Sequence, residues 1–226
     1  MCAAATTPRD MCIETQIFSL PVPYREAWEM QKRRNEQVAQ GIGSECIVAM
    51  QHPPVYTLGF HGDERNMKAT AEQLAGIELI RIERGGDITF HGPGQLVVYP
   101  IINLRRRAIG VRRFVELIES CVMDFCSEHH IATHLRQDAP GVWCDSGGSD
   151  KKICAIGLKI RHGVSMHGLA LNITTPLHYF QAINPCGFDS TQVTSMEQQA
   201  ERTPCFADAA STLTHQLKQA IKDAST

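Results

Sequence analysis

Cys186 is the residue of this sequence whose neighbours best suit it to act as a nucleophile. It stands between Pro185 and Gly187, which predicts a turn where a thiol can face a cleft. Most of the other cysteines occur in predicted strands and helices. The reactive form of cysteine is the thiolate, and a free thiol with a pKa of ~8.5 is only a few per cent ionised at neutral pH. Cys186 therefore needs a neighbouring cation or base, and an inert thiol is the alternative interpretation.

Lysines and histidines elsewhere in the chain are candidate partners for this thiol. A lysine ammonium stabilises a thiolate, and its pKa falls readily on desolvation, so lysine can also act as a base. A histidine beside the cysteine would give a papain-like pair. These residues would meet only in the fold, so sequence spacing leaves the choice open. The candidates are Lys151, Lys152, Lys159, His91 and His167.

A glycine-rich segment, Arg84–Gln95, is the third feature that could serve chemistry, and we call it the glycine segment. It contains four glycines, a proline, an arginine and a histidine between two apolar stretches. Glycine allows close approach of the backbone to a ligand and left-handed backbone angles. The segment fits either a pair of tight hairpins or a loop moulded around an elongated small molecule.

The bulk properties limit the classes of protein that fit. The chain has 226 residues, 43% of them apolar and 20% charged, with a net charge of −2. That balance gives no overall attraction to nucleic acid or membrane, and no apolar run approaches the ~20 residues of a membrane span. The nine cysteines include no Cys-x-x-Cys pair, which favours a reducing, cytoplasmic compartment over a disulfide framework. Residues 1–12 lack the pattern of a secretory signal and are expected to form a disordered leader.

Hydrophobic periodicity predicts many strands and a few long helices. The clearest helix spans 111–129, where apolar residues recur at spacings of three and four, and further helices are expected at 24–40, 71–74 and 206–221. Strands are expected at 14–20, 46–50, 55–58 (continuing the strand before it), 78–82, 87–90, 95–103, 131–135, 141–144, 153–160 and 164–173. We therefore expect one α+β or α/β domain over residues 13–226, with a large mixed sheet.

Four motifs, taken together, resemble the octanoyltransferases of lipoate biosynthesis, which are relatives of the lipoate-protein and biotin-protein ligases. The motifs are Arg84–Gln95, Lys152–Gly157, His167–Asn172 and Pro185–Gly187, and Asp138–Trp143 also looks like the family. The similarity runs over about residues 47–195. It implies a two-layer α+β fold of the biotin/lipoate-protein ligase type, formed by a single catalytic domain.

The resemblance also implies a mechanism. Cys186 would attack an octanoyl thioester on acyl carrier protein and form an acyl-enzyme, and a lysine of a lipoyl domain would then accept the acyl group as an amide. Lys152, at the family's lysine position, would lower the pKa of Cys186 and shuttle protons. Because an amide replaces a thioester, the reaction needs no ATP, and neither a cofactor nor a metal is expected.

The family's substrate-contacting positions map onto three stretches of this chain, and the small side chains among them would leave room for an eight-carbon chain. Backbone amides near Gly168 or Cys186 could form an oxyanion hole. For His91 and His167, a hydrogen-bonded framework role remains the alternative, and Lys159 is expected to be a solvated strand residue. The predicted substrate-binding residues are Arg84, Gly85, Gly86, Asp87, Ile88, Thr89, Phe90, His91, Ala155, Ile156, Gly157, Gly168, Leu169 and Ala170.

Other functions remain open at this level. An ATP-dependent lipoate-protein ligase would form an adenylate and would not depend on Cys186; a binding module would form no thioester; a cysteine hydrolase would release octanoate to water. The implied partners are octanoyl acyl carrier protein, lipoyl domains of 2-oxoacid dehydrogenases and the glycine cleavage H protein. The resemblance also implies that the enzyme is a monomer. The basic run Arg105–Arg107, with Arg112 and Arg113, is either a docking patch for these acidic proteins or a solvated helix start.

Overall fold

A large mixed sheet forms the centre of the molecule. The computed structural model describes residues 12–70, 74, 76–184 and 192–225, so residues 1–11 of the expected leader and the Pro185–Gly187 motif lie outside the described residues. Neighbouring strands are antiparallel except for the β1–β2 pair, which is parallel. The strand order is β1 (Ile13–Ile17), β2 (Glu45–Met50), β6 (Gln95–Ile101), β10 (Val164–Asn172), β9 (Asp150–Arg161), β8 (Val142–Asp145) and β7 (His134–Leu135).

Three of the expected strands form a second, smaller sheet. Its order is β4 (Glu78–Arg81), β3 (Val55–Leu58) and β5 (Ile88–His91), with β3 parallel to β4 and antiparallel to β5. The expectation that 55–58 continues the strand before it was therefore wrong. Pro53 and Pro54 intervene between the two strands, and proline supplies no N–H to a ladder. The chain changes sheet at this point and returns to the large sheet at β6.

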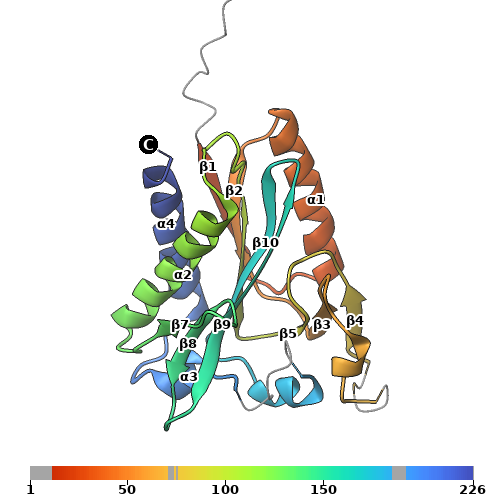
Figure 1. Cartoon of the computed structure of the whole chain (residues 1–226), viewed down its shortest axis with the longest axis vertical. Coiled ribbons are helices and arrows are strands. Elements are labelled where there is room, and N and C mark those ends of the chain that lie inside the picture. Colours follow the sequence, from red (N-terminus) through yellow and green to blue (C-terminus); the bar gives the residue numbers. More distant parts are fainter. Residues whose placement is uncertain (1–11, 71–73, 75, 185–191, 226) are drawn as a thin grey trace, which may run out of the picture.

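Long helices cover both faces of the large sheet (Figure 1). Helix α1 (Tyr24–Gln40) lies on one face, whereas α2 (Val111–Glu128) and α4 (Phe206–Asp223) lie together on the other. These helices confirm the predictions from periodicity, while 71–73 of the expected short helix are not described. Helix α1 ends at Gly41, whose φ of 75° allows its N–H to reach the last helical carbonyls. Short helices that the pattern did not indicate are η2 (Glu64–Asn66), η3 (Leu177–Ala182) and α3 (Met196–Gln199).

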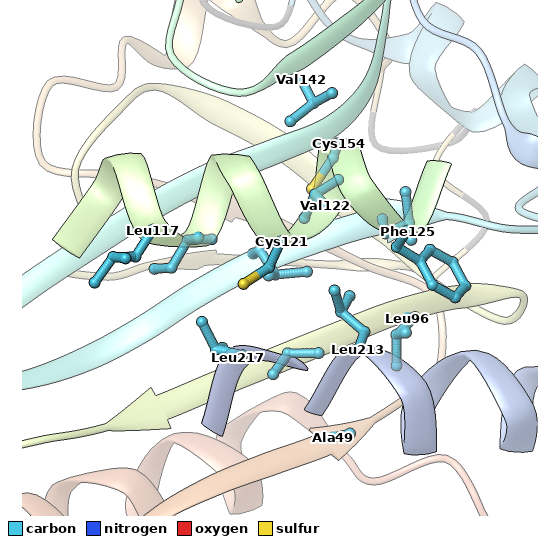
Figure 2. Close-up of a cluster of buried hydrophobic side chains, with 14 of the residues drawn as sticks. Ala49, Leu96, Leu117, Cys121, Val122, Phe125, Val142, Cys154, Leu213 and Leu217 are labelled. Atoms are coloured by element: carbon cyan, nitrogen blue, oxygen red, sulfur yellow. The ribbon is translucent and has the colours of Figure 1, made fainter. Parts of the chain in front are cut away.

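The main core fills the space between the sheet and the α2/α4 pair. The apolar stripe of α2, including Val122 and Phe125, packs against Leu213 and Leu217 of α4 and against strand residues such as Leu96. Figure 2 shows these side chains meeting between the two helices and the strands. Because α4 contacts β1, β2, β6 and α2, the last helix of the chain closes the core that the first strands begin.

The basic run 105–107 divides between surface and interior. Arg107 is buried and its Nε donates to the Glu45 carboxylate at 2.6 Å, while Arg106 contacts the same carboxylate at 3.1 Å. Arg107 also donates to the Ser225 hydroxyl (3.1 Å), just after α4. The expectation of one exposed basic patch was therefore wrong for Arg107, because a buried carboxylate neutralises it. Among the described residues, no helix has the length and apolar character needed to cross a membrane.

Candidate functional site

A cavity of about 460 Å³ lies where the glycine segment crosses the large sheet. Its walls come from β5, β9, β10 and the loop before β8, and most of the lining is carbon. Of the three candidate lysines, Lys152 is the one that lines it, whereas Lys159 stands near the Phe60 ring, 5.9 Å from its centroid. The predicted site residues found in its lining are Arg84, Gly85, Gly86, Ile88, Thr89, His91, Lys152, Ala155, Ile156, Gly157, Gly168, Leu169 and Ala170.

Two predicted contacts face away from this cavity. The Asp87 carboxylate accepts from the backbone N–H of Asp63 (3.2 Å) and of Ile88 (2.7 Å), and it also contacts the Asn66 amide. Phe90 is fully buried in the small-sheet cluster, where its ring stacks on Tyr179 at 4.5 Å. Both residues shape the outer side of the glycine segment, and neither belongs to the cavity lining.

The glycine segment lies directly on strand β9. The N–H of Gly85 donates to the backbone oxygen of Leu158 at 2.9 Å. A Cβ on Gly157 would stand 2.9 Å from the Gly85 oxygen, so a side chain there would push the segment off the sheet. Gly86 has a φ of 88°, which favours glycine. Of the two interpretations of this segment, the geometry favours a loop that forms a cavity wall.

A chain of buried hydrogen bonds starts at Arg84. Its Nη2 donates to the backbone oxygen of Thr57 (2.7 Å) and to the Thr57 hydroxyl (3.0 Å). That hydroxyl lies 3.3 Å from Nε2 of His91, and Nδ1 of His91 lies 2.8 Å from Oε1 of Gln95. The Gln95 amide nitrogen donates to the oxygen of Phe90 (3.2 Å), so Oε1 is the acceptor. His91 therefore donates through Nδ1 and accepts at Nε2.

Gln95 extends this chain to the backbone beside Lys152. Its amide nitrogen donates to Oδ1 of Asn172 at 2.9 Å, and the Asn172 amide donates to the oxygen of Thr194 at 3.0 Å. The N–H of Thr194 donates to the Lys152 oxygen (3.0 Å), and the N–H of Lys152 donates to the Gln192 oxygen (2.8 Å). Gln95 and Asn172, motif residues for which the sequence predicted no role, thus connect the glycine segment to β9, the strand that contains Lys152.

These contacts favour a framework role for His91. Burial, reinforced by nearby His52, lowers the pKa of His91 well below its ordinary value, so the ring is neutral at pH 7. Both ring nitrogens already have partners within the fold. A proton acceptor for Cys186 would need a nitrogen that is available to the cavity, and His91 offers none.

The polar end of the cavity contains residues that the sequence did not single out. Tyr24 and Tyr99 both line it, and Tyr99 donates its hydroxyl to Nε2 of His52 at 2.8 Å. Nδ1 of His52 donates to the backbone oxygen of Val22 (2.7 Å), which fixes the neutral tautomer. Burial lowers the pKa of His52 to about 4 and raises the pKa of Tyr99. Neither tyrosine belongs to a motif with recognisable spacing, so the amino-acid sequence alone did not indicate that they line the cavity.

His167 enters the cavity from an irregular point in β10. Its φ is 57°, a left-handed angle that costs energy for a residue with a side chain. Continuing the β6–β10 register brings Pro100 opposite His167, and proline has no N–H for the ladder. The N–H of His167 donates to Oε1 of Gln31 from α1 at 2.8 Å. The imidazole lines the cavity.

The imidazole of His167 is buried beside a carboxylate. Nε2 lies 3.8 Å from Oε1 of Glu83, which is an electrostatic contact rather than a hydrogen bond, and neither ring nitrogen has a hydrogen-bond partner among the described residues. Burial lowers the pKa of His167. The imidazole, with the indole N–H of Trp28 (3.1 Å), holds the pKa of Glu83 below its usual value.

Cys186 lies outside the described residues, and the structure describes the chain on both sides of it. On one side, the N–H of Asn184 donates to the Asn66 oxygen at 2.8 Å. On the other, Gln192 and Thr194 bind the backbone of Lys152, as described above. Among the described residues, no group of three or more histidine, cysteine, aspartate or glutamate side chains could hold a metal ion.

The overall fold is shared with solved protein ligases. Protein Ta0514 of T. acidophilum with bound lipoic acid superposes with a TM-score of 0.70 at 13% identity, covering 92% of this chain and 85% of that one. Lipoate-protein ligase A bound with ATP gives 0.67 at 13% identity over 92% and 85%. A biotin protein ligase from Aquifex aeolicus gives 0.52 at 9% identity over 95% and 71%. The fold is therefore that of the lipoate-protein ligases.

Residues 23–218 match the family described as the lipoyl protein ligase A/B catalytic domain, and the chain belongs to this family. Within it, the chain is 42% identical over 208 residues to an octanoyltransferase of Bacteroides fragilis, covering 88% of this chain and 94% of that protein. It is 46% identical over 186 residues to an octanoyltransferase of Bacteroides thetaiotaomicron, covering 79% and 82%. The resemblance inferred from the four motifs is confirmed.

Proposed function

We propose that this chain is an acyltransferase that moves an octanoyl group from acyl carrier protein to a lysine of lipoyl domains, through a thioester on Cys186. The observation that carries the proposal is its similarity, at 42–46% identity over most of the chain, to octanoyltransferases. The cavity agrees with it, because carbon dominates the lining and a lysine from the family motif stands in the wall.

Two substitutions at one carbonyl carbon complete the reaction. The thiolate of Cys186 attacks the thioester carbonyl, the bond to the carrier sulfur breaks, and the carrier thiol leaves with a proton. The amine of the acceptor lysine then attacks the acyl-enzyme and the bond to the Cys186 sulfur breaks as the amide forms. The amine's proton passes to the now neutral Lys152, so the Cys186 thiolate and the Lys152 ammonium ion are both restored. Lys152, as an ammonium ion, stabilises the thiolate and supplies the proton to the leaving sulfur.

The cavity also supports the binding of an apolar acyl chain. Residues without large side chains, such as Ala155, Gly157, Gly168 and Ala170, leave space between the glycine segment and strands β9 and β10. Burial of about seven apolar carbons contributes on the order of 5 kcal/mol at ~0.8 kcal/mol each. Most of the affinity for the acyl group therefore comes from its tail.

An ATP-dependent lipoate-protein ligase is the second candidate, because the fold is shared with such a ligase bound with ATP. A ligase activates a free acid as an adenylate, whereas a transferase starts from an activated thioester. The two candidates therefore differ in whether ATP is consumed and in whether a cysteine carries the acyl group.

Intact-mass measurement separates these candidates. Incubated with octanoyl acyl carrier protein and no ATP, the enzyme is expected to gain one octanoyl group, and an added lipoyl domain is expected to remove it and appear octanoylated. Cys186→Ser should abolish the adduct, and the matched control Cys205→Ser, at an exposed cysteine, should load normally. An adduct that persists in Cys186→Ser, or transfer that requires free octanoate and ATP, would contradict the proposal.

We further propose a monomeric cytoplasmic enzyme that serves lipoyl domains of 2-oxoacid dehydrogenases and the glycine cleavage H protein. Seven cysteines among the described residues are free thiols, which fits a reducing compartment. Arg112 and Arg113 are exposed and could steer acidic partners, although both contact Glu116. Reversing both charges is expected to raise KM for the acyl carrier protein, and an unchanged KM would reject the steering.

A further inference from the structure

Trp143 and Lys152 face each other across two neighbouring strands of the large sheet. Trp143 belongs to β8 and Lys152 to β9, which are neighbouring strands (Figure 1). The two residues form a direct cross-strand pair. Opposite residues of an antiparallel pair project from the same face of the sheet. Nζ of Lys152 stands 4.8 Å from the centre of the indole ring, within the range of a cation–π contact.

The indole ring is fixed in place. Trp143 is fully buried, and its Nε1 donates to the backbone oxygen of Ala139 at 3.0 Å, which prevents rotation of the ring. A cation–π contact strengthens when water is excluded from the ring face, and tryptophan gives the strongest contact of the aromatic residues. The ring is therefore a rigid, partly negative surface against which an ammonium ion can rest.

Charged side chains from the neighbouring elements also lie near this lysine. The guanidinium of Arg136 lies 4.6 Å from the same ring centre and binds Asp138 at 2.7 Å, while Asp150 lies 3.6 Å from Arg136. Asp138 lines the cavity with Lys152, and the hydrogen bond from Arg136, with a smaller contribution from the charge of Lys152, lowers the pKa of Asp138. Helix α2 contributes Glu119, which accepts from the N–H of Gly141 at 3.2 Å.

Gly141 lies next to Lys152, at the point where β8 and β9 approach each other closely. Gly141 has a φ of 119°, and a Cβ there would stand 2.4 Å from the Cys154 oxygen and 3.5 Å from Cε of Lys152. A side chain at this position would push β8 away from β9, whereas its contact with the lysine stem would be an ordinary van der Waals contact. Gly141 therefore allows the two strands to lie close together beside Lys152.

We propose that Trp143 is a positioning residue that holds Lys152 as an ammonium ion, aimed along the cavity wall. This inference rests on the proposed function, in which that ammonium stabilises the Cys186 thiolate. A π face favours the charged form of lysine over the neutral amine, so the indole ring assigns Lys152 an electrostatic role in the resting enzyme. Cys186 then loses its proton to solvent, and the ammonium proton remains on Lys152 until the carrier sulfur leaves.

Two substitutions at Trp143 test this role. Trp143→Leu removes the π face and Trp143→Phe keeps a weaker one, so both loosen the ammonium ion and reduce stabilisation of the thiolate. The readout is the rate of alkylation of Cys186 by iodoacetamide against pH, followed by peptide mass mapping. We expect the profile to move to higher pH by about half a unit or more in Trp143→Leu, with a smaller shift in Trp143→Phe. The rate of octanoyl loading should fall roughly tenfold in Trp143→Leu.

Phe114→Leu is the matched control, because it removes a buried aromatic ring of α2 in the main core. It should lower the melting temperature and leave the alkylation profile of Cys186 unchanged. Normal profiles and loading rates in the Trp143 variants would overturn the inference, and Trp143→Phe decides the matter if Trp143→Leu does not fold. Octanoyl loading that survives Cys186→Ser would instead refute the proposed function, so the two failures are distinguishable.

Discussion

At the scale of single residues, the Thr57 hydroxyl joins two parts of the site. It accepts from the Arg84 guanidinium and stands next to Nε2 of His91, in a position fully withdrawn from water. Thr57→Val preserves the shape and leaves buried polar atoms on both neighbours without this partner. We expect the free energy of unfolding to fall by about 1–3 kcal/mol, measured by urea denaturation.

Thr15→Val, at an exposed residue of edge strand β1, provides the control for this loss. It should change stability by less than about 0.5 kcal/mol. If the two substitutions lowered the free energy of unfolding equally, the buried hydrogen bonds of Thr57 would contribute no more to stability than an exposed threonine does.

At the scale of secondary-structure elements, the close contact of β10 with β6 depends on Gly168. A Cβ at this position would stand 2.1 Å from the backbone oxygen of Val98 and 2.7 Å from Cδ of Pro100. Gly168→Ala would therefore separate two central strands and displace His167 next to it. We expect a loss of at least about 2 kcal/mol in unfolding free energy, by the mechanisms known for overpacked cores. Gly110→Ala, with open space around it, should cost less than about 1 kcal/mol, because it affects only the N-cap of α2.

The elements also show which parts of the structure one sequence can predict. The 3.6-residue periodicity of 111–129 is a local property, and α2 matched it within one residue. Assignment of β3, β4 and β5 to a second sheet depends on pairing between residues far apart in the chain, which local patterns do not encode. The site shows the same division. The resemblance of the motifs to the family pointed to Arg84 and Lys152, whereas Thr57 became visible only once the fold placed its hydroxyl beside His91.

At the scale of the whole molecule, three buried histidines make stability depend on pH. Burial lowers the pKa of His52 to about 4 and also lowers those of His91 and His167. A histidine whose pKa is depressed by folding binds its proton more readily in the unfolded chain. Its contribution is present above the unfolded pKa of ~6.5 and is lost as pH falls toward the folded pKa. Each such group contributes about 1.4 kcal/mol per pH unit within that window.

Urea denaturation at several pH values between 7.5 and 4.5 measures this dependence. The unfolding free energy should decrease steadily below pH 6.5. In His52→Asn it should decrease less steeply with falling pH, whatever the stability of this variant at pH 7.5. His215→Gln, at an exposed position of α4, should reproduce the slope of the parent chain. A stability that stays constant from pH 7 to 4.5 would contradict the neutral state assigned to these rings.

The position of α4 at the end of the chain has a consequence for biosynthesis. This helix covers β1, β2 and β6 and packs on α2, so the apolar faces of the earliest strands lack their cover until the last helix is made. A polypeptide emerging from the ribosome would expose these faces throughout translation, the condition in which nascent chains aggregate or recruit chaperones. A ribosome stalled before residue 206 should therefore hold an incompletely folded, protease-sensitive chain.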